Sequence, residues 1–160
     1  MTGERRWLIT GGSRGIGAAL VAAARDRGDE VVFTGRDAQA VERVALGTGA
    51  HGFVADVASG EDNQRTVDVC RERMGGIDVL VNNAGWGYGA PIGEIDMDRM
   101  RALFDTNVFG LVDLTNRVVP GMKTRGGGDI VNVASTSGLK GHRNGTAYSA
   151  SKWAVRGISQ

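Results

Sequence analysis

The sequence is poor in cysteine, in charge of one sign and in long apolar runs, and each absence excludes a class of protein. The single cysteine, Cys70, cannot form an internal disulfide, so a reducing, cytoplasmic setting is expected. Lys plus Arg number 19 and Asp plus Glu 18, a formal net charge of +1. Nucleic-acid and membrane-surface partners are therefore not expected, because such proteins usually carry a basic excess. No apolar run is long enough to span a bilayer, and the first residues do not resemble a signal peptide.

Metal and acyl-hydrolase sites are not expected either. His51 and His142 lack partner ligands at metal spacing. No serine lies in a G-x-S-x-G elbow, which argues against an acyl hydrolase. Cys70 lies in a helix-like stretch, where a buried structural thiol is expected rather than a reactive one.

Glycine is abundant, with 26 residues, and apolar segments between the glycines indicate tight turns rather than disorder. Short apolar runs alternate with longer helix-like stretches. Strands are predicted over residues 7–10, 30–34, 52–55, 77–81 and 129–133. Helices are predicted over 16–27, 38–46, 61–74, 97–122 with a break near Asn107, and from 148 onward. This rhythm predicts one α/β domain, a doubly wound parallel Rossmann-like sheet with right-handed crossovers.

The segment from Thr10 to Gly17 lies between the first predicted strand and helix. Its glycines let the backbone turn and approach a pyrophosphate, and the helix N-terminus offers free N–H groups, although a purely structural turn would look similar. The spacing is T-G-x-x-x-G-x-G rather than G-x-G-x-x-G. It resembles the short-chain dehydrogenase/reductase family. The resemblance implies cofactor contacts by Gly11, Ser13, Arg14, Gly15, Ile16 and Gly17.

The end of the second predicted strand indicates which cofactor is bound. An acidic residue there would bind the ribose hydroxyl of NAD, but Gly35 occupies that place and Arg36 follows. Together with Arg14, Arg36 could hold a 2′-phosphate through forked, charge-assisted hydrogen bonds. The alternative is that both are ordinary surface arginines. NADP(H) is therefore predicted in preference to NAD(H).

Two further motifs follow the third and fourth predicted strands. The family places an Asp that contacts adenine after the third strand, and Asp56-Val57 matches it, although a lone Asp is more often a loop cap. The segment from Asn82 to Gly85 matches the N-N-A-G motif. Its asparagines are expected to tie strand ends together, while Ala84 and Gly85 leave room for the cofactor ribose. The cofactor residues implied here are Asp56, Val57, Asn83, Ala84 and Gly85.

Tyr148 and Lys152 are four residues apart, so they share one helix face. A fixed ammonium one turn away favours the phenolate form of the tyrosine and so eases proton exchange. The pair alone occurs by chance in many helices. The resemblance makes Tyr148 the proton donor and gives Lys152 a second role in holding the nicotinamide ribose. It implies that both residues also contact the cofactor.

Two more residues complete the implied catalytic set. Ser135 precedes Tyr148 by thirteen residues, the separation found in the family, and its hydroxyl would stabilise the substrate oxygen. Ser137 competes for that role. Asn107 matches the helix asparagine that orders a water beside the lysine, although an isolated helical Asn also suggests a local kink. Trp86, Tyr88 and Pro91 could form apolar walls of a substrate cleft, and His142 could line it.

The resemblance implies hydride transfer between NADP(H) and a carbonyl or secondary alcohol, with reduction the favoured direction and the substrate open among 3-oxoacyl thioesters, steroids, sugars and small ketones. An NADP(H)-binding module without turnover is the alternative, and a partner-binding scaffold a weaker one. Family members continue beyond the helix of Tyr148, and without that part the sheet is expected to have an exposed edge at the fifth strand. A longer protein is expected, in preference to a true fragment. The complete chain is expected to form a homo-oligomer, a dimer or tetramer, through the helices around Asn107 and Tyr148.

Overall fold

The computed structural model describes residues 4–160, and its strands and helices alternate along the chain. The strands are β1 (Arg6–Ile9), β2 (Glu30–Gly35), β3 (His51–Val54), β4 (Val79–Asn82) and β5 (Asp129–Asn132). The α-helices are α1 (Gly15–Asp26), α2 (Ala38–Thr48), α3 (Gly60–Met74), α4 (Met97–Phe104), α5 (Leu111–Thr124) and α6 (Thr146–Ile158). A π-helical turn, η1 (Asp105–Gly110), joins α4 to α5, and a short 3₁₀ turn, η2 (Thr136–Gly138), follows β5.

The strands form one parallel sheet in the order β3-β2-β1-β4-β5. Leu8 of β1 pairs with Val32 of β2 on one side and with Leu80 of β4 on the other. The chain therefore builds outward from β1 in one direction and then in the other, which confirms the predicted doubly wound sheet. In such sheets ligands bind where the order reverses, beyond the carboxyl ends of the strands. Here that point lies between β1 and β4.

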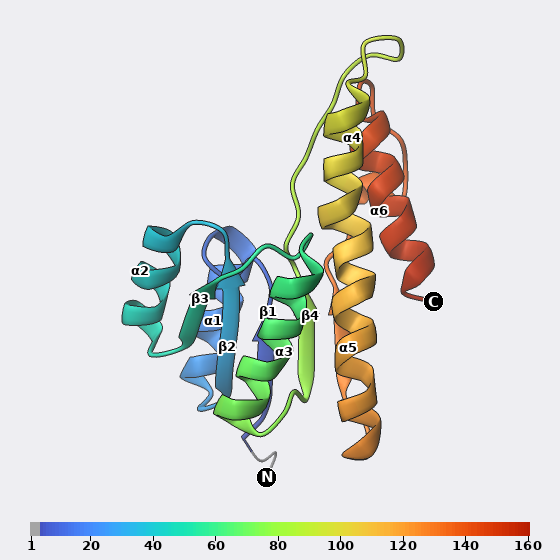
Figure 1. Ribbon diagram of the computed structural model, residues 1–160. Coiled ribbons are helices and arrows are strands. Elements are labelled where there is room, and N and C mark those ends of the chain that lie inside the picture. The colour runs from blue at the N-terminus through green and yellow to red at the C-terminus, as the bar shows by residue number, and fades with distance from the viewer. Residues whose placement is uncertain (1–3) are drawn as a thin grey trace.

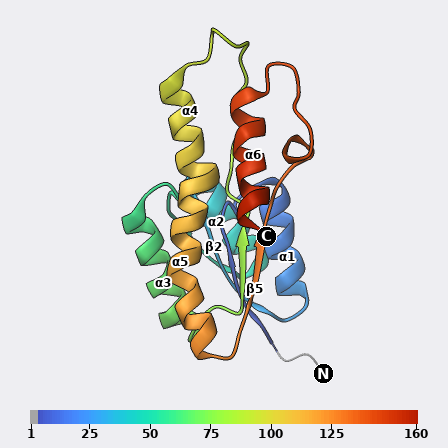
Figure 2. The same cartoon turned by 90° about the vertical axis from the view of Figure 1, so that its right-hand side faces the viewer.

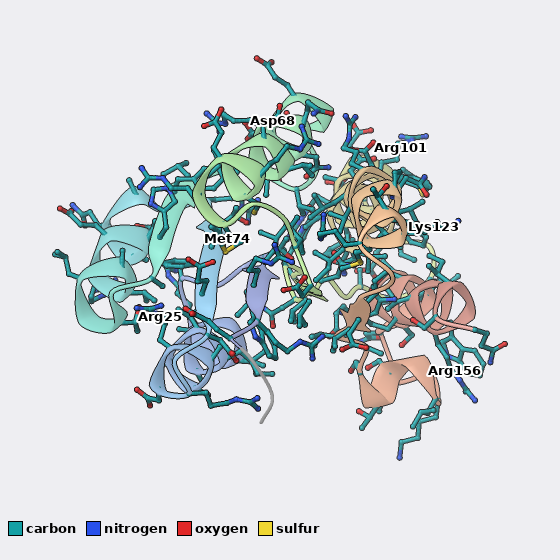
Figure 3. All side chains as sticks on the ribbon, turned by 90° about the horizontal axis from the view of Figure 1, so that it is seen from below. Arg25, Asp68, Met74, Arg101, Lys123 and Arg156 are labelled. Carbon is teal, nitrogen blue, oxygen red and sulfur yellow. The ribbon has the colours of Figure 1, made fainter. Side chains whose placement is uncertain are left out.

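Helices cover both faces of the sheet (Figure 1). On one face α3 and α5 pack on Leu8 and Leu80, and on the other α1 and α2 pack on Ile9 and Phe33. Seen from below, Met74 points toward the sheet while Asp68, Arg101, Lys123 and Arg156 extend outward (Figure 3). Leu80 has no exposed surface, and its replacement by Ala would cost about 2–5 kcal/mol of stability.

The predicted strand and helix bounds agree with the structure to within about two residues. One difference at the site is Thr10, which the sequence places in the first strand but which begins the following turn. Gly11 has a φ of +64°, so the chain bends away at this point. The Thr10 hydroxyl then accepts hydrogen bonds from the backbone N–H groups of Asn83 and Ala84, both at 3.1 Å.

The predicted break near Asn107 is confirmed, because η1 interrupts an otherwise continuous column of helix (Figure 1). Gly110 in η1 lies so close to the Val57 carbonyl that any side chain would overlap it. Helix α6 packs beside α4 and η1 (Figure 2). The expected edge at the fifth strand is also confirmed, since β5 ends the order and Ile130 and Val131 are exposed. Within residues 4–160, no helix is both long and apolar enough to cross a membrane.

Candidate active site

The turn between β1 and α1 is held close to the end of β4. A Cβ at Gly11 would lie 2.9 Å from the Ala84 Cα, and one at Gly17 would overlap the Gly11 carbonyl oxygen. Only glycine permits this approach of helix, turn and strand. Asn83 fixes it further, because its side-chain amide donates to the carbonyl oxygens of Thr10 (3.0 Å) and Gly11 (3.1 Å).

A cavity of about 570 Å³ opens beside this turn, at the carboxyl ends of β1 to β4. Its walls include eight of the residues predicted to bind a cofactor: Gly11, Ser13, Arg14, Arg36, Asp56, Val57, Ala84 and Gly85. Residues without a predicted cofactor role also form its walls: Thr34, Gly35, Asp37, Ala55, Trp86 and Thr106. The cavity thus joins the glycine turn, the end of β2 and the loops after β3 and β4. The other residues predicted to bind a cofactor are not in its wall: Gly15, Ile16, Gly17, Asn83, Tyr148 and Lys152.

Both predicted phosphate-binding arginines lie exposed at the cavity and are paired with acids. Arg14 bonds to Asp37, and the nearest Arg36 nitrogen lies 3.9 Å from an Asp56 oxygen. Asp37 also accepts from the Ala40 N–H at the start of α2, and this bond, with Arg14 nearby, lowers the pKa of its carboxyl. Sequence reasoning missed Asp37, although an Asp just before a helix-like run is a recognisable N-cap signal.

The loops after β3 and β4 hold the cavity walls through side-chain to backbone bonds. Asp56 accepts from the Ala58 N–H at 3.0 Å, so the loop-cap role is present beside any cofactor role. Asn82 donates to Thr115 of α5 and to Asn132 of β5. The expected tying of strand ends by Asn82 and Asn83 is therefore confirmed.

Asn107 lies in the widened π turn and is almost fully buried. Its oxygen accepts from the Trp86 N–H, and its amide nitrogen donates to the Trp86 carbonyl oxygen, each at 3.0 Å. The same nitrogen donates to the Ser151 hydroxyl of α6 at 3.1 Å. Single π turns occur often at functional sites, and this one directs Asn107 toward both the cavity wall and α6.

Tyr148 and Lys152 lie on one side of α6, facing the segment after β4. The Lys152 ammonium is 5.9 Å from the centre of the Tyr148 ring and donates to the Val133 carbonyl oxygen at 2.7 Å. Burial lowers the pKa of Lys152 below its usual 10.5, since the charged form loses water. A Cβ at Gly85, in the cavity wall, would lie 3.7 Å from the Lys152 nitrogen. The lysine therefore reaches the cavity's edge.

Ser135 lies just before the η2 turn and is its N-cap residue. Its hydroxyl oxygen accepts from the Ser137 N–H at 3.1 Å, which leaves the hydroxyl proton free to donate. Ser137, the competing serine, is only 8% exposed, whereas Ser135 is half-buried. Access therefore favours Ser135.

The three residues expected to wall a substrate cleft have different surroundings. Trp86 lines the cavity and donates from its indole to Thr106 at 3.3 Å. Tyr88 instead is buried: its hydroxyl accepts from the Asp96 N–H, and the Arg99 guanidinium stacks 4.4 Å from its ring. Tyr88 thus anchors its own loop, and the expectation of a cleft wall is corrected at this position. Pro91 is exposed.

The buried Cys70 thiol has its pKa raised to about 12, as expected for a structural cysteine. His142 is exposed, and burial lowers the pKa of His51 on β3. In the described part of the chain, no group of three His, Cys, Asp or Glu side chains is placed to hold a metal ion.

Comparison with known proteins agrees with this geometry. A family model described as short chain dehydrogenase matches residues 5–160. An uncharacterized oxidoreductase of Staphylococcus saprophyticus is 36% identical over 96% of this chain and 68% of its own. An acetoacetyl-CoA reductase of Shinella zoogloeoides is 39% identical over 91% of this chain and 61% of its own. The crystal structure of a short-chain dehydrogenase from Streptomyces avermitilis has a TM-score of 0.93 and 35% identity, covering 99% of this chain and 59% of that one.

The chain belongs to the short-chain dehydrogenase/reductase family. It spans between 59% and 68% of the length of these three relatives. Enzymes of this family are oxidoreductases that use NAD(H) or NADP(H).

The cavity fits a dinucleotide of this family. Gly15, at the start of α1, has open space where a Cβ would point, and Arg14 before it offers a guanidinium without capping the helix. The free N–H groups of that helix end and the nearby charge suit a pyrophosphate. Ser13, Gly15, Ile16 and Gly17 surround this helix start, and Ile16 is exposed beside it.

Proposed function

We propose that the protein transfers a hydride between NADP(H) and a carbonyl or secondary alcohol. The observation that carries the proposal is the Tyr148–Lys152 pair, placed on α6 with the buried ammonium beside Gly85 of the cavity wall. When bound, NADP(H) would supply or accept the hydride. The remaining work falls to side chains of this chain.

In reduction, the Tyr148 hydroxyl donates a proton to the substrate oxygen, while the Ser135 hydroxyl donates a hydrogen bond to the same atom. Lys152 places a positive charge near the phenol ring, which favours proton release. Asn107 holds the Trp86 backbone. We propose that it also helps to resupply protons to Lys152. Lys152 and Tyr148 would also hold the nicotinamide ribose.

The preference for NADP(H) rests on charge at the end of β2. Gly35 stands where an acid would bind the ribose hydroxyl of NAD, and the exposed guanidinium groups of Arg14 and Arg36 lie at the same cavity. A 2′-phosphate would compete with Asp37 and Asp56 for these two guanidinium groups. The remaining proposed cofactor contacts are Gly11, Ser13, Gly15, Ile16, Gly17, Asp56, Val57, Asn83, Ala84 and Gly85.

We also propose that the complete protein forms a homo-oligomer. Met97 of α4 and Phe109 of η1 are 51% and 61% exposed, and Trp153 of α6 is 48% exposed. Large apolar side chains grouped on these helices suit burial against a second copy. Size-exclusion chromatography with light scattering would measure the assembly.

The test of the activity is NADPH oxidation with a panel of acetoacetyl-CoA, a steroid ketone, a keto sugar and small ketones. We expect turnover of at least one, and a loss of about 1000-fold in kcat in Tyr148→Phe, within the range for a general acid. NADPH affinity should fall far less than kcat, since the substitution removes one ribose contact while the phenyl ring keeps the packing and the cavity residues are unchanged. NADPH binding with no turnover across the panel would support the alternative, an NADP(H)-binding module.

A further inference from the structure

Ser151 lies in α6 between Tyr148 and Lys152, and none of its surface is exposed. Its side chain meets η1. The Ser151 hydroxyl accepts from the Asn107 amide at 3.1 Å and donates to the Tyr148 carbonyl oxygen at 2.8 Å. The hydroxyl oxygen thus accepts a bond from η1, while its single proton is donated within α6.

Asn107 extends this connection to the cavity wall. Its amide has two protons, one for the Trp86 carbonyl and one for the Ser151 hydroxyl, and its oxygen accepts from the Trp86 N–H. A continuous set of hydrogen bonds therefore joins three segments: the loop after β4, the π turn, and the turn of α6 that carries Tyr148. Lys152 follows Ser151 directly in that turn.

Ser149 shows that burial on α6 does not by itself produce such bonds. It is only 7% exposed, two residues from Ser151, yet its hydroxyl has no hydrogen-bond partner within residues 4–160. The two serines therefore differ in bonding while sharing size, burial and helix. Ser149 is a matched control for the hydroxyl of Ser151.

We propose that Ser151 is a positioning residue, which fixes the turn of Tyr148 and Lys152 against Asn107 and so against the cavity wall. The proposal rests on the proposed oxidoreductase function. Removing the hydroxyl leaves one buried N–H of Asn107 without an acceptor, and such a group relaxes toward a new partner. Small displacements of catalytic groups cost large factors in rate, up to about 100-fold for about 1 Å.

A double-mutant cycle on kcat tests whether Ser151 acts through Asn107. The probe is NADPH with the carbonyl of the panel that the wild type reduces fastest. We expect Ser151→Ala to lower kcat by about tenfold in the wild-type background and by less than about twofold in Asn107→Ala, because the bond is already lost there. The KM for NADPH should change less than kcat, since most of the proposed cofactor contacts come from cavity residues that the substitution leaves unchanged.

Ser149→Ala should leave kcat within about twofold, because it removes no hydrogen bond. Ser151→Cys fills the site with a somewhat larger thiol, which is only a weak acceptor for the Asn107 amide, so it should reproduce the loss if Ser151→Ala does not fold. Equal losses in both backgrounds, or an equal loss in Ser149→Ala, would overturn the proposal.

Hydrogen exchange separates this inference from the proposed function. In Ser151→Ala, the amide of Trp86 should exchange faster than in the wild type, whereas in Ser149→Ala it should not change. A wild type that reduces no carbonyl, with this exchange difference present, contradicts the oxidoreductase function and keeps the coupling. Turnover in the wild type without the exchange difference contradicts the coupling alone.

Discussion

The two sides of the candidate site are built in opposite ways. At the cavity, glycines leave room for a cofactor, and the charge is carried by side chains that are open to solvent. The Arg14 side chain is 70% exposed and the Arg36 side chain 64%. Around α6 and η1, the working side chains are buried, with Asn107 at 2% and Lys152 at 6% exposure. The cavity side therefore depends on backbone shape and on several weak, additive charges. The α6 side depends on single atoms fixed by packing.

Replacing Lys152 should give the largest effect, because it is the buried charge on the packed side. We expect Lys152→Met to lower kcat by about 100-fold to 10,000-fold, the range for loss of an acid–base contribution. Steady-state kinetics with NADPH measures it, with the exposed Lys123→Met as control. A loss below about tenfold would place Lys152 outside the chemistry.

The same variant tests the charge of Lys152 through stability. Because burial lowers its pKa in the folded chain below 10.5, the unfolded chain binds more protons between the two values. Wild-type stability should therefore rise with pH in that window relative to Lys152→Met. Urea unfolding at several pH values measures the difference, and equal pH slopes would contradict it.

On the cavity side, the strongest effect should come from a glycine. In Gly17→Ala the added methyl group would overlap the Gly11 carbonyl oxygen, so the turn must shift. We expect NADPH affinity to fall by about 100-fold, roughly 2.7 kcal/mol, as measured by fluorescence titration. Gly47→Ala in α2, where the added methyl meets open space, should instead bind normally and gain up to about 1 kcal/mol of stability.

A single arginine on the cavity side should matter least. We expect Arg36→Ala to weaken NADPH binding by about tenfold and to leave NADH binding unchanged, because one exposed charge contact contributes little. Arg71 is a matched control, since it is also exposed and paired with an aspartate. Normal NADPH binding by Arg36→Ala, or equal wild-type affinity for the two cofactors, would remove the basis for an NADP(H) preference.

Sequence patterns predicted most of the cavity side and less of the α6 side. Glycine spacing and the strand ends near Asp56 and Asn83 are local signals, and parallel strands bring their carboxyl ends to one edge. The bonds of Asn107 cross 21 residues to Trp86 and 44 to Ser151. Such long-range pairings have no characteristic spacing in the sequence. The sequence therefore does not indicate the bonds of Ser151 or the anchoring role of Tyr88.

By itself, the sequence determined the parallel sheet, the glycine turn and the one-turn spacing of Tyr148 and Lys152, because helix period and glycine freedom act over a few residues. Only the tertiary structure decided which buried serine has partners, which tyrosine is an anchor, and how the π turn meets α6. Those outcomes depend on packing between elements distant in the chain, where a side chain's surroundings, rather than its identity, set its role.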